Sequence, residues 1–311
     1  FPGFLVGFSY VITYLLDISL YPVMFATYLN EAIGYEMDPW VSWAIAASLV
    51  IALTIVNLVG VQIVVAVSFL FLLVVISPFL IIPILGIQYL NPGIWFKGAQ
   101  SFPTDAYWGY MLTLLIWNNS GWMSPAFLAG ETRHVRRNYP RAMLTSMILA
   151  GVTYVVPLAI GICVDRDWAN WDIGIFATVG EKVGGEWLKL WIIIASMFTN
   201  AGLFNSAMTT SSRSIAAMAD IGYFPKILGC EVPYIRTPFV GVMIDCIVTL
   251  ILIRLPFSTL IGAQTCINSM TMIILYVAFI YFRFKQPNRA RPFKVPLNNF
   301  LCILFVLPPV F

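Results

Sequence analysis

The chain has 311 residues, of which 60% are hydrophobic and 10% are charged, and its mean hydropathy is +0.88. This composition excludes an ordinary soluble domain, in which about 25% of the residues are charged. The net charge of +3 does not indicate nucleic-acid binding, because the basic residues cluster beside apolar segments, as in loops at a membrane surface. We therefore expect an all-α, polytopic membrane protein.

Nine apolar segments follow one another along the chain, bounded by charged residues, glycine and proline. A helix needs about 20 residues to cross a bilayer. The first segment has no hydrophilic stretch before it and the last is too short to cross, so we expect an internal fragment, truncated at both ends, that forms a single domain. The predicted membrane helices cover residues 3–29, 40–60, 62–88, 106–130, 140–163, 187–220, 238–255, 257–283 and 298–311.

Charged residues alternate between the loops that connect these segments. Twelve of the 17 lysines and arginines lie in three loops, and nine of the 14 acids lie in the three others. Loops rich in lysine and arginine stay in the cytoplasm. The predicted cytoplasmic loops are residues 131–141, 213–238 and 283–296, and the loops predicted on the opposite side are residues 30–39, 89–105 and 165–186.

Asp17 lies in the middle of the first predicted membrane helix. A carboxylate at this depth costs about 3 kcal/mol on insertion scales, and such residues are by default candidates for a functional site. Asp17 is therefore predicted to be a counter-ion to a substrate amine or a carrier of the coupling proton. The alternative is an acid that hydrogen-bonds to a neighbouring helix and serves packing alone.

The fourth predicted helix contains a polar break over residues 117–125. Backbone without regular hydrogen bonds persists at membrane depth only where it lines a polar cavity or is buried in protein, and broken helices mark the binding sites of secondary transporters. Two amides, two tryptophans and backbone groups are suited to binding an amine or a zwitterion. The alternative is a simple kink. The predicted binding residues here are Trp117, Asn118, Asn119, Ser120, Gly121 and Trp122.

The segment 187–220 is rich in small and hydroxyl residues, which favour close helix packing. Packing explains most of this run, and the exceptions are Asn200 and Asn205, of which Asn205 is included among the predicted substrate-binding residues. The five cysteines are scattered without CxxC spacing, and the single histidine, His134, lies in a basic loop. These patterns predict no metal site, no cofactor and no catalytic residues, so an enzyme is not expected.

Several segments together resemble the amino acid-polyamine-organocation superfamily of secondary transporters. Residues 127–141 carry a Glu before a basic, proline-containing loop, as after the broken sixth helix of that family. The eighth helix and the segment after the tenth have similar counterparts. These counterparts are residues 212–225, with Ser-Arg, Ala-Met-Ala, Gly and Pro, and residues 291–296, with the run Arg-Pro-Phe-Lys-Val-Pro.

The resemblance implies an inverted-repeat transporter fold that is present here from the third helix into the eleventh. The missing first helix supplies half of the substrate site in this family, so the fragment alone is not expected to transport. Asp17 and the following Leu-Tyr-Pro-Val run resemble the polyamine uptake permeases of plants and protozoa. Members of that subfamily carry acids where this chain has Met123 and Asn205. With two fewer acids to bind a polycation, an amino acid is expected as a substrate as much as a polyamine is.

The resemblance also implies the partners. We expect an amino acid or polyamine substrate, a coupling proton or other cation, and a lipid bilayer, with the plasma membrane favoured over an organelle. The loop 30–39 contains no cysteine, so no disulfide-linked heavy chain is expected. The alternatives are an exchanger of neutral amino acids and, more distantly, a membrane receptor or channel.

Overall fold

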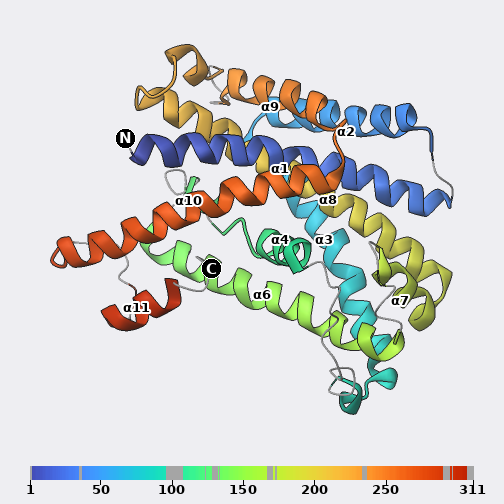
Figure 1. Ribbon diagram of the computed structural model, residues 1–311. Helices are drawn as coiled ribbons and strands as arrows, with labels where there is room; N and C mark the ends of the chain where they lie inside the picture. The colour runs from blue at the N-terminus through green and yellow to red at the C-terminus, as the bar shows by residue number, and fades with distance from the viewer. Residues whose placement is uncertain are drawn as a thin grey trace. The chain divides into compact units, whose positions relative to one another are not determined.

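The computed structural model of the chain is made of helices (Figure 1). In the part of the chain that the structure describes, the one pairing of extended residues is an isolated bridge between Glu231 and Pro238. The prediction of an all-α protein is therefore confirmed. The structure describes residues 2–34, 37–95, 108–122, 124–127, 132, 134–166, 171, 174–232, 237–289, 295 and 297–306.

Within the described residues, six helices are long and apolar enough to cross a membrane. The shortest of them has 21 residues, which at 1.5 Å per residue spans about 30 Å, the thickness of the hydrocarbon core. They are α1 (Pro2–Ile33), α2 (Pro39–Val59), α3 (Val61–Gly86), α6 (Val135–Val164), α8 (Glu186–Asp220) and α10 (Phe257–Lys285).

The other predicted membrane segments contain shorter helices. The segment 106–130 contains α4 (Trp108–Asn118) and α5 (Ser124–Phe127), and the segment 238–255 contains α9 (Phe239–Leu252). The last segment contains α11 (Asn299–Val306). Three-residue and four-residue 3₁₀ turns complete the described elements, namely η1 (Ile87–Tyr89), η2 (Pro92–Ile94) and η5 (Lys226–Gly229).

The long helices expose apolar side chains. On α3, for example, Val65, Phe69 and Leu73 are each more than half exposed, and on α6 Met147 and Val155 are exposed to a similar extent. In water such continuous apolar surface would promote association. In a bilayer it faces lipid tails at no cost. Together with the six long helices, this surface supports an integral, multi-pass membrane protein.

One predicted loop contains a helix. Residues 165–186 are expected to be a loop, but α7 (Ile175–Gly184) lies within them. Helix α7 has only 10 residues, which is too short to cross a membrane, so it does not produce the long apolar run that predicts a membrane helix. Two residues of α7 form ion pairs. Lys182 lies 2.7 Å from Asp165, at the start of the predicted loop, and Glu181 lies 2.7 Å from Lys189 of α8.

A second correction concerns the basic loop at residues 131–141. Residues 135–140 of this predicted loop are the first turns of α6, which begins after His134 with hydrogen bonds from the amides of Arg137 and Asn138 to the His134 carbonyl. Charge marks where a helix leaves the hydrocarbon, but a helix continues beyond that point when its backbone remains hydrogen-bonded. Glu131, the acid that precedes the basic residues of this loop, lies outside the described residues.

Contacts divide the chain into two units. Unit 1 comprises Phe1–Ser19, Gly109–Pro140 and Ala207–Phe311, and unit 2 comprises Leu20–Trp108 and Arg141–Ser206. The long helices α1 and α8 each contribute residues to both units. The break between α4 and α5 belongs to unit 1.

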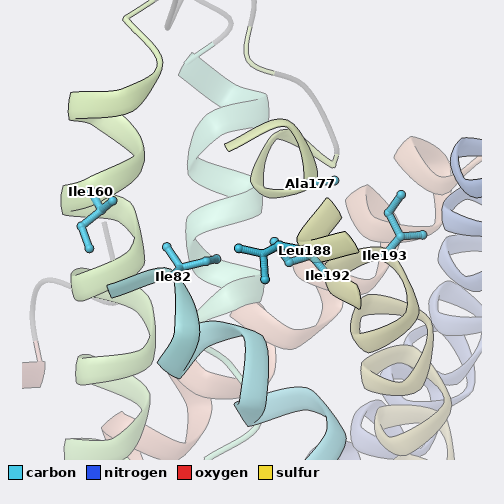
Figure 2. Packing of buried hydrophobic residues seen from close by; sticks show 6 residues of the cluster. All are labelled: Ile82, Ile160, Ala177, Leu188, Ile192 and Ile193. Atoms are coloured by element: carbon cyan, nitrogen blue, oxygen red, sulfur yellow. The ribbon is translucent and has the colours of Figure 1, made fainter. Parts of the chain in front are cut away.

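A cluster of apolar side chains forms the core of unit 2 (Figure 2). Four helices supply it, and its members are at most 3% exposed. In a membrane such packing stabilises mainly through dispersion contacts, because lipid tails are as apolar as the side chains. The labelled residues are Ile82 of α3, Ile160 of α6, Ala177 of α7, and Leu188, Ile192 and Ile193 of α8.

Candidate functional site at the helix break

The helix predicted over residues 106–130 is interrupted where the sequence becomes polar. Helix α4 ends at Asn118, α5 begins at Ser124, and residues 119–122 lie outside any helix. Gly121 has a φ of 86°, in the left-handed region that residues with a Cβ avoid. The predicted interruption is therefore confirmed. Met123 lies outside the described residues.

Two polar side chains of the break donate hydrogen bonds to backbone carbonyls at the end of α4. Asn119 donates from Nδ2 to the Leu115 carbonyl (2.9 Å), and Ser120 donates from Oγ to the Trp117 carbonyl (2.7 Å). Each of these carbonyls also accepts a backbone N–H bond, from Asn119 and Ser120 respectively. Both carbonyls thus accept two bonds. Asn and Ser at these positions stabilise the break itself.

Asp17 contacts the end of α4. The indole Nε1 of Trp117 donates a hydrogen bond to Asp17 Oδ1, at 3.1 Å. Asp17 is partly buried, so its side chain points toward the break and not outward. This orientation agrees with the expectation for an acid in a membrane helix. Its role in binding remains a prediction.

Tyrosines on the same face of α1 contact the other side of the break. Tyr10, Tyr14 and Asp17 are spaced by four and three residues, so they share one helix face. The hydroxyls of Tyr14 and Ser124 are hydrogen-bonded at 2.9 Å, and the rings of Tyr10 and Tyr14 stack with centroids 6.2 Å apart. Helix α1 therefore contacts the end of α4 through Asp17 and the start of α5 through Tyr14.

Helix α10 completes the surroundings of this face within unit 1. The ring of Phe257 meets the ring of Trp117 edge to face, with centroids 5.9 Å apart. The Tyr10 hydroxyl lies 3.9 Å from the sulfur of Met272. Residues of α1, α4 and α10 are thus linked through Trp117, which contacts both Asp17 and Phe257.

The sequence prediction missed Tyr10, Tyr14 and Phe257. The two tyrosines were predictable, because residues three or four positions apart in a helix lie on the same face, as Tyr10, Tyr14 and Asp17 do. Phe257 offers no local signal, because it reaches Trp117 from a helix more than 100 residues away in sequence.

The remaining predicted binding residues differ in their exposure and in the unit to which they belong. Asn118, Gly121 and Trp122 are exposed, and Ser120 is partly buried. Asn205 is fully buried in unit 2. Its Oδ1 accepts from Asn57 of α2 at 2.8 Å, and its Nδ2 donates to Ser68 of α3 at 3.0 Å. Asn205 therefore links three helices through its amide.

The group around Asp17 has the chemistry of a cation site. A carboxylate forms charge-assisted hydrogen bonds to an ammonium, and the faces of aromatic rings attract cations. A carboxylate accepts at about four lone-pair positions, so the Trp117 bond is compatible with a bound ammonium. In the described part of the chain, no group of three His, Cys, Asp or Glu residues is arranged to hold a metal ion.

The chain is similar in sequence to known transporters. The profile of a family described as amino acid permease matches residues 1–311. The polyamine transporter RMV1 of Arabidopsis thaliana is 30% identical over 308 residues, 99% of this chain and 62% of that protein. The polyamine transporter PUT1 of Oryza sativa subsp. japonica is 29% identical over 99% of this chain and 57% of that protein.

A third relative transports amino acids, as its name states. The large neutral amino acids transporter small subunit 2 of Homo sapiens is 28% identical over 180 residues, 57% of this chain and 33% of that protein. The chain spans about three fifths of the length of the plant relatives it matches. Because the family profile covers every residue, the chain belongs to the amino acid permease family of the amino acid-polyamine-organocation superfamily.

Proposed function

We propose that the protein is a secondary active transporter that moves amino acids or polyamines across a membrane by alternating access, with a proton or another cation as the coupling ion. The observation that carries the proposal is the hydrogen bond between Asp17 and Trp117 at a broken helix. Discontinuous helices in transporters hold the substrate near the bilayer midplane. The plant relatives named above are called polyamine transporters.

In this proposal, Asp17 binds an ammonium group of the substrate. The Trp117 N–H orients the carboxylate, and the rings of Trp117 and Tyr14 border the aliphatic part of the ligand. Buried charges are stable only when paired, so a substrate ammonium and Asp17 stabilise one another. The rest of the proposed border is formed by the partly buried Ser120 and by the exposed residues Asn118, Asn119, Gly121 and Trp122.

Charge counting limits the substrate. Polyamine permeases of the resembling subfamily carry acids at two positions where this chain has Met123 and Asn205. The amide of Asn205 bonds to neighbouring helices and supplies no net charge. Asp17 therefore neutralises one ammonium. This favours an amino acid, or a polyamine whose further ammonium groups are bound elsewhere or remain in water.

Uptake of labelled substrates by the full protein in proteoliposomes tests the proposal. An inward proton gradient is applied, and putrescine, spermidine, arginine, lysine and leucine compete for uptake. We expect saturable, gradient-stimulated uptake in which arginine or lysine competes at least as well as spermidine. Uptake of leucine that requires internal amino acid and ignores the gradient would instead indicate a neutral exchanger. Absence of uptake for the whole panel would contradict the proposal.

We further propose the plasma membrane as the site of action. The alternating basic and acidic loops set the orientation of the chain but not the organelle. Surface biotinylation of intact cells that express the full protein tests this proposal. Labelling only after the cells are permeabilised would place the protein in an internal membrane.

A further inference from the structure

A second membrane acid, Asp245, lies in α9 and is fully buried, with 0% of its surface exposed. Ser211 of α8 donates from Oγ to Asp245 Oδ1 at 2.7 Å. The other oxygen, Oδ2, has no hydrogen-bond partner among the described residues. All of these atoms belong to unit 1. The substrate site described above makes no use of this acid.

The surroundings of Asp245 exclude water. Thr249 lies one turn further along α9, is also 0% exposed, and has a hydroxyl without a partner among the described residues. Helix α9 approaches α8 closely at Gly241, where an added Cβ would lie 2.9 Å from the Ser212 carbonyl oxygen. The two helices are therefore in direct contact on the face that carries Asp245.

This environment favours a neutral carboxyl. Among the described residues, the hydroxyl of Ser211 on α8 donates to Asp245, and Thr249 lies one turn further along the same helix as Asp245. In the described part of the chain, the ion pairs involve other acids, namely Asp165, Glu181 and Glu186. A buried carboxylate with a single neutral donor is several kcal/mol less stable than in water, and such groups take up a proton instead.

We propose that Asp245 is a proton-binding site: its carboxyl holds a proton while α9 lies against α8 and releases it to water when this contact opens. The proton joins one carboxylate oxygen from water and returns to water, so no other reactant is needed. A sodium ion fits less well, because transporter sodium sites use carbonyls of unwound helices, whereas α8 and α9 are continuous through Ser211 and Asp245. The use of this proton in transport rests on the function proposed above, but its binding does not.

Infrared spectroscopy of the full protein in lipid tests proton binding directly. We expect the unmodified protein at neutral pH to show the carbonyl stretch of a buried carboxylic acid. The Asp245→Asn variant should lose this band. The matched control Asp220→Asn, which removes an exposed acid at the end of α8, should keep it. Absence of the band at neutral pH, or its loss on addition of sodium chloride, would overturn the proposal.

A second variant assigns the band even if Asp245→Asn fails to fold. Ser211→Ala removes the hydrogen bond to Oδ1, so the carbonyl stretch should move to higher frequency. A band that does not move in this variant belongs to another acid and would contradict the assignment.

Transport measurements separate the coupling role from proton binding. A pH gradient of one unit supports about tenfold accumulation of substrate per coupled proton. Asp245→Asn should lose this factor and keep the exchange of labelled for unlabelled substrate. Unchanged accumulation would overturn the coupling role. If the unmodified protein takes up no substrate, the proposed function fails, while the infrared result still decides whether Asp245 binds a proton.

Discussion

Trp117 has two functions at the helix break that separate experimentally. Its ring contacts Phe257, and its indole N–H donates to Asp17. The N–H fixes the direction of the carboxylate, so it affects an ammonium ligand through Asp17. The ring contacts persist when the N–H is removed.

Trp117→Phe is therefore expected to weaken binding of cationic substrates while uptake at saturation is kept. A hydrogen bond to a charged group contributes about 1.5 kcal/mol or more, so KM should rise about tenfold. The measurement is the concentration dependence of uptake in proteoliposomes. Trp187→Phe is the matched control, because Trp187 is exposed and belongs to unit 2, outside the proposed substrate site, and it should leave KM unchanged. Equal effects of the two substitutions would show that the Asp17 bond is not involved.

The buried amide of Asn205 has two possible roles, which are to bond neighbouring helices together and to bind the substrate. Its contacts with Asn57 and Ser68 favour packing between α2, α3 and α8. Interhelical hydrogen bonds in membranes contribute about 0.6 kcal/mol on average and up to about 1.7 kcal/mol.

Asn205→Ala should lower the free energy of unfolding by about 1–2 kcal/mol, seen as a lower Tm in detergent. Asn200→Ala is the control: the Asn200 side chain bonds to the Ser196 carbonyl of its own helix, so its loss should cost less. Added substrate should stabilise the Asn205→Ala variant as much as the unmodified protein. A stabilisation that disappears in this variant would restore Asn205 as a ligand contact.

Among the elements, the break between α4 and α5 depends on backbone geometry at Gly121. No atom lies within 4 Å of a Cβ added there, so substitution is limited by the positive φ and not by space. A residue with a Cβ costs about 1–2 kcal/mol in this conformation.

Gly121→Ala should therefore lower Tm and reduce uptake, because relief of the strain would straighten the break and move Trp117. Gly109→Ala provides the control, since Gly109 lies in α4 with equally open space and an ordinary φ. Alanine there should be neutral or stabilising, by up to about 1 kcal/mol. Full uptake by Gly121→Ala would mean that the left-handed turn is not required.

The elements also show where sequence reasoning succeeded and where it failed. Long apolar runs, free of charge except for Asp17 in the first, identified the six long helices of the described chain, because membrane spans carry a strong composition signal. Helix α7 was missed because it is too short to span. The start of α6 was missed because a helix continues into its basic flank. The polar break was predictable because it lies within one segment of the sequence. Its contacts with α1 and α10 were not predictable, because they join residues that are distant in sequence.

For the whole molecule, the arrangement of basic loops predicts the orientation in the membrane. Cys230 is exposed and lies in the predicted cytoplasmic loop 213–238. A membrane-impermeant maleimide should label Cys230 only after the cells are permeabilised. With Cys230 replaced by Ser, a Glu186→Cys variant should be labelled in intact cells, since that exposed side chain lies at the opposite end of α8. The reverse pattern would invert the assigned topology.

The candidate site was only partly predictable from the sequence. Asp17 and Trp117 were identified one by one, from the cost of a buried charge and from a polar break. Their direct contact is a tertiary fact, since 100 residues separate them. An asparagine in a membrane helix is able either to bind a ligand or to bond to a neighbouring helix, and the sequence does not separate these roles. The full burial of Asn205 favours the second role.

The account rests on Asp17 as the counter-ion of a substrate ammonium, and uptake by an Asp17→Asn variant tests this most directly. The amide preserves the size of the side chain and an acceptor for the Trp117 N–H, and it removes the charge. Loss of a close charge pair in a partly buried site costs about 3 kcal/mol, so uptake of a cationic substrate below saturation should fall about a hundredfold at unchanged surface expression. Unchanged uptake by Asp17→Asn, or tight uptake of spermidine by the unmodified protein with exclusion of all amino acids, would contradict the account.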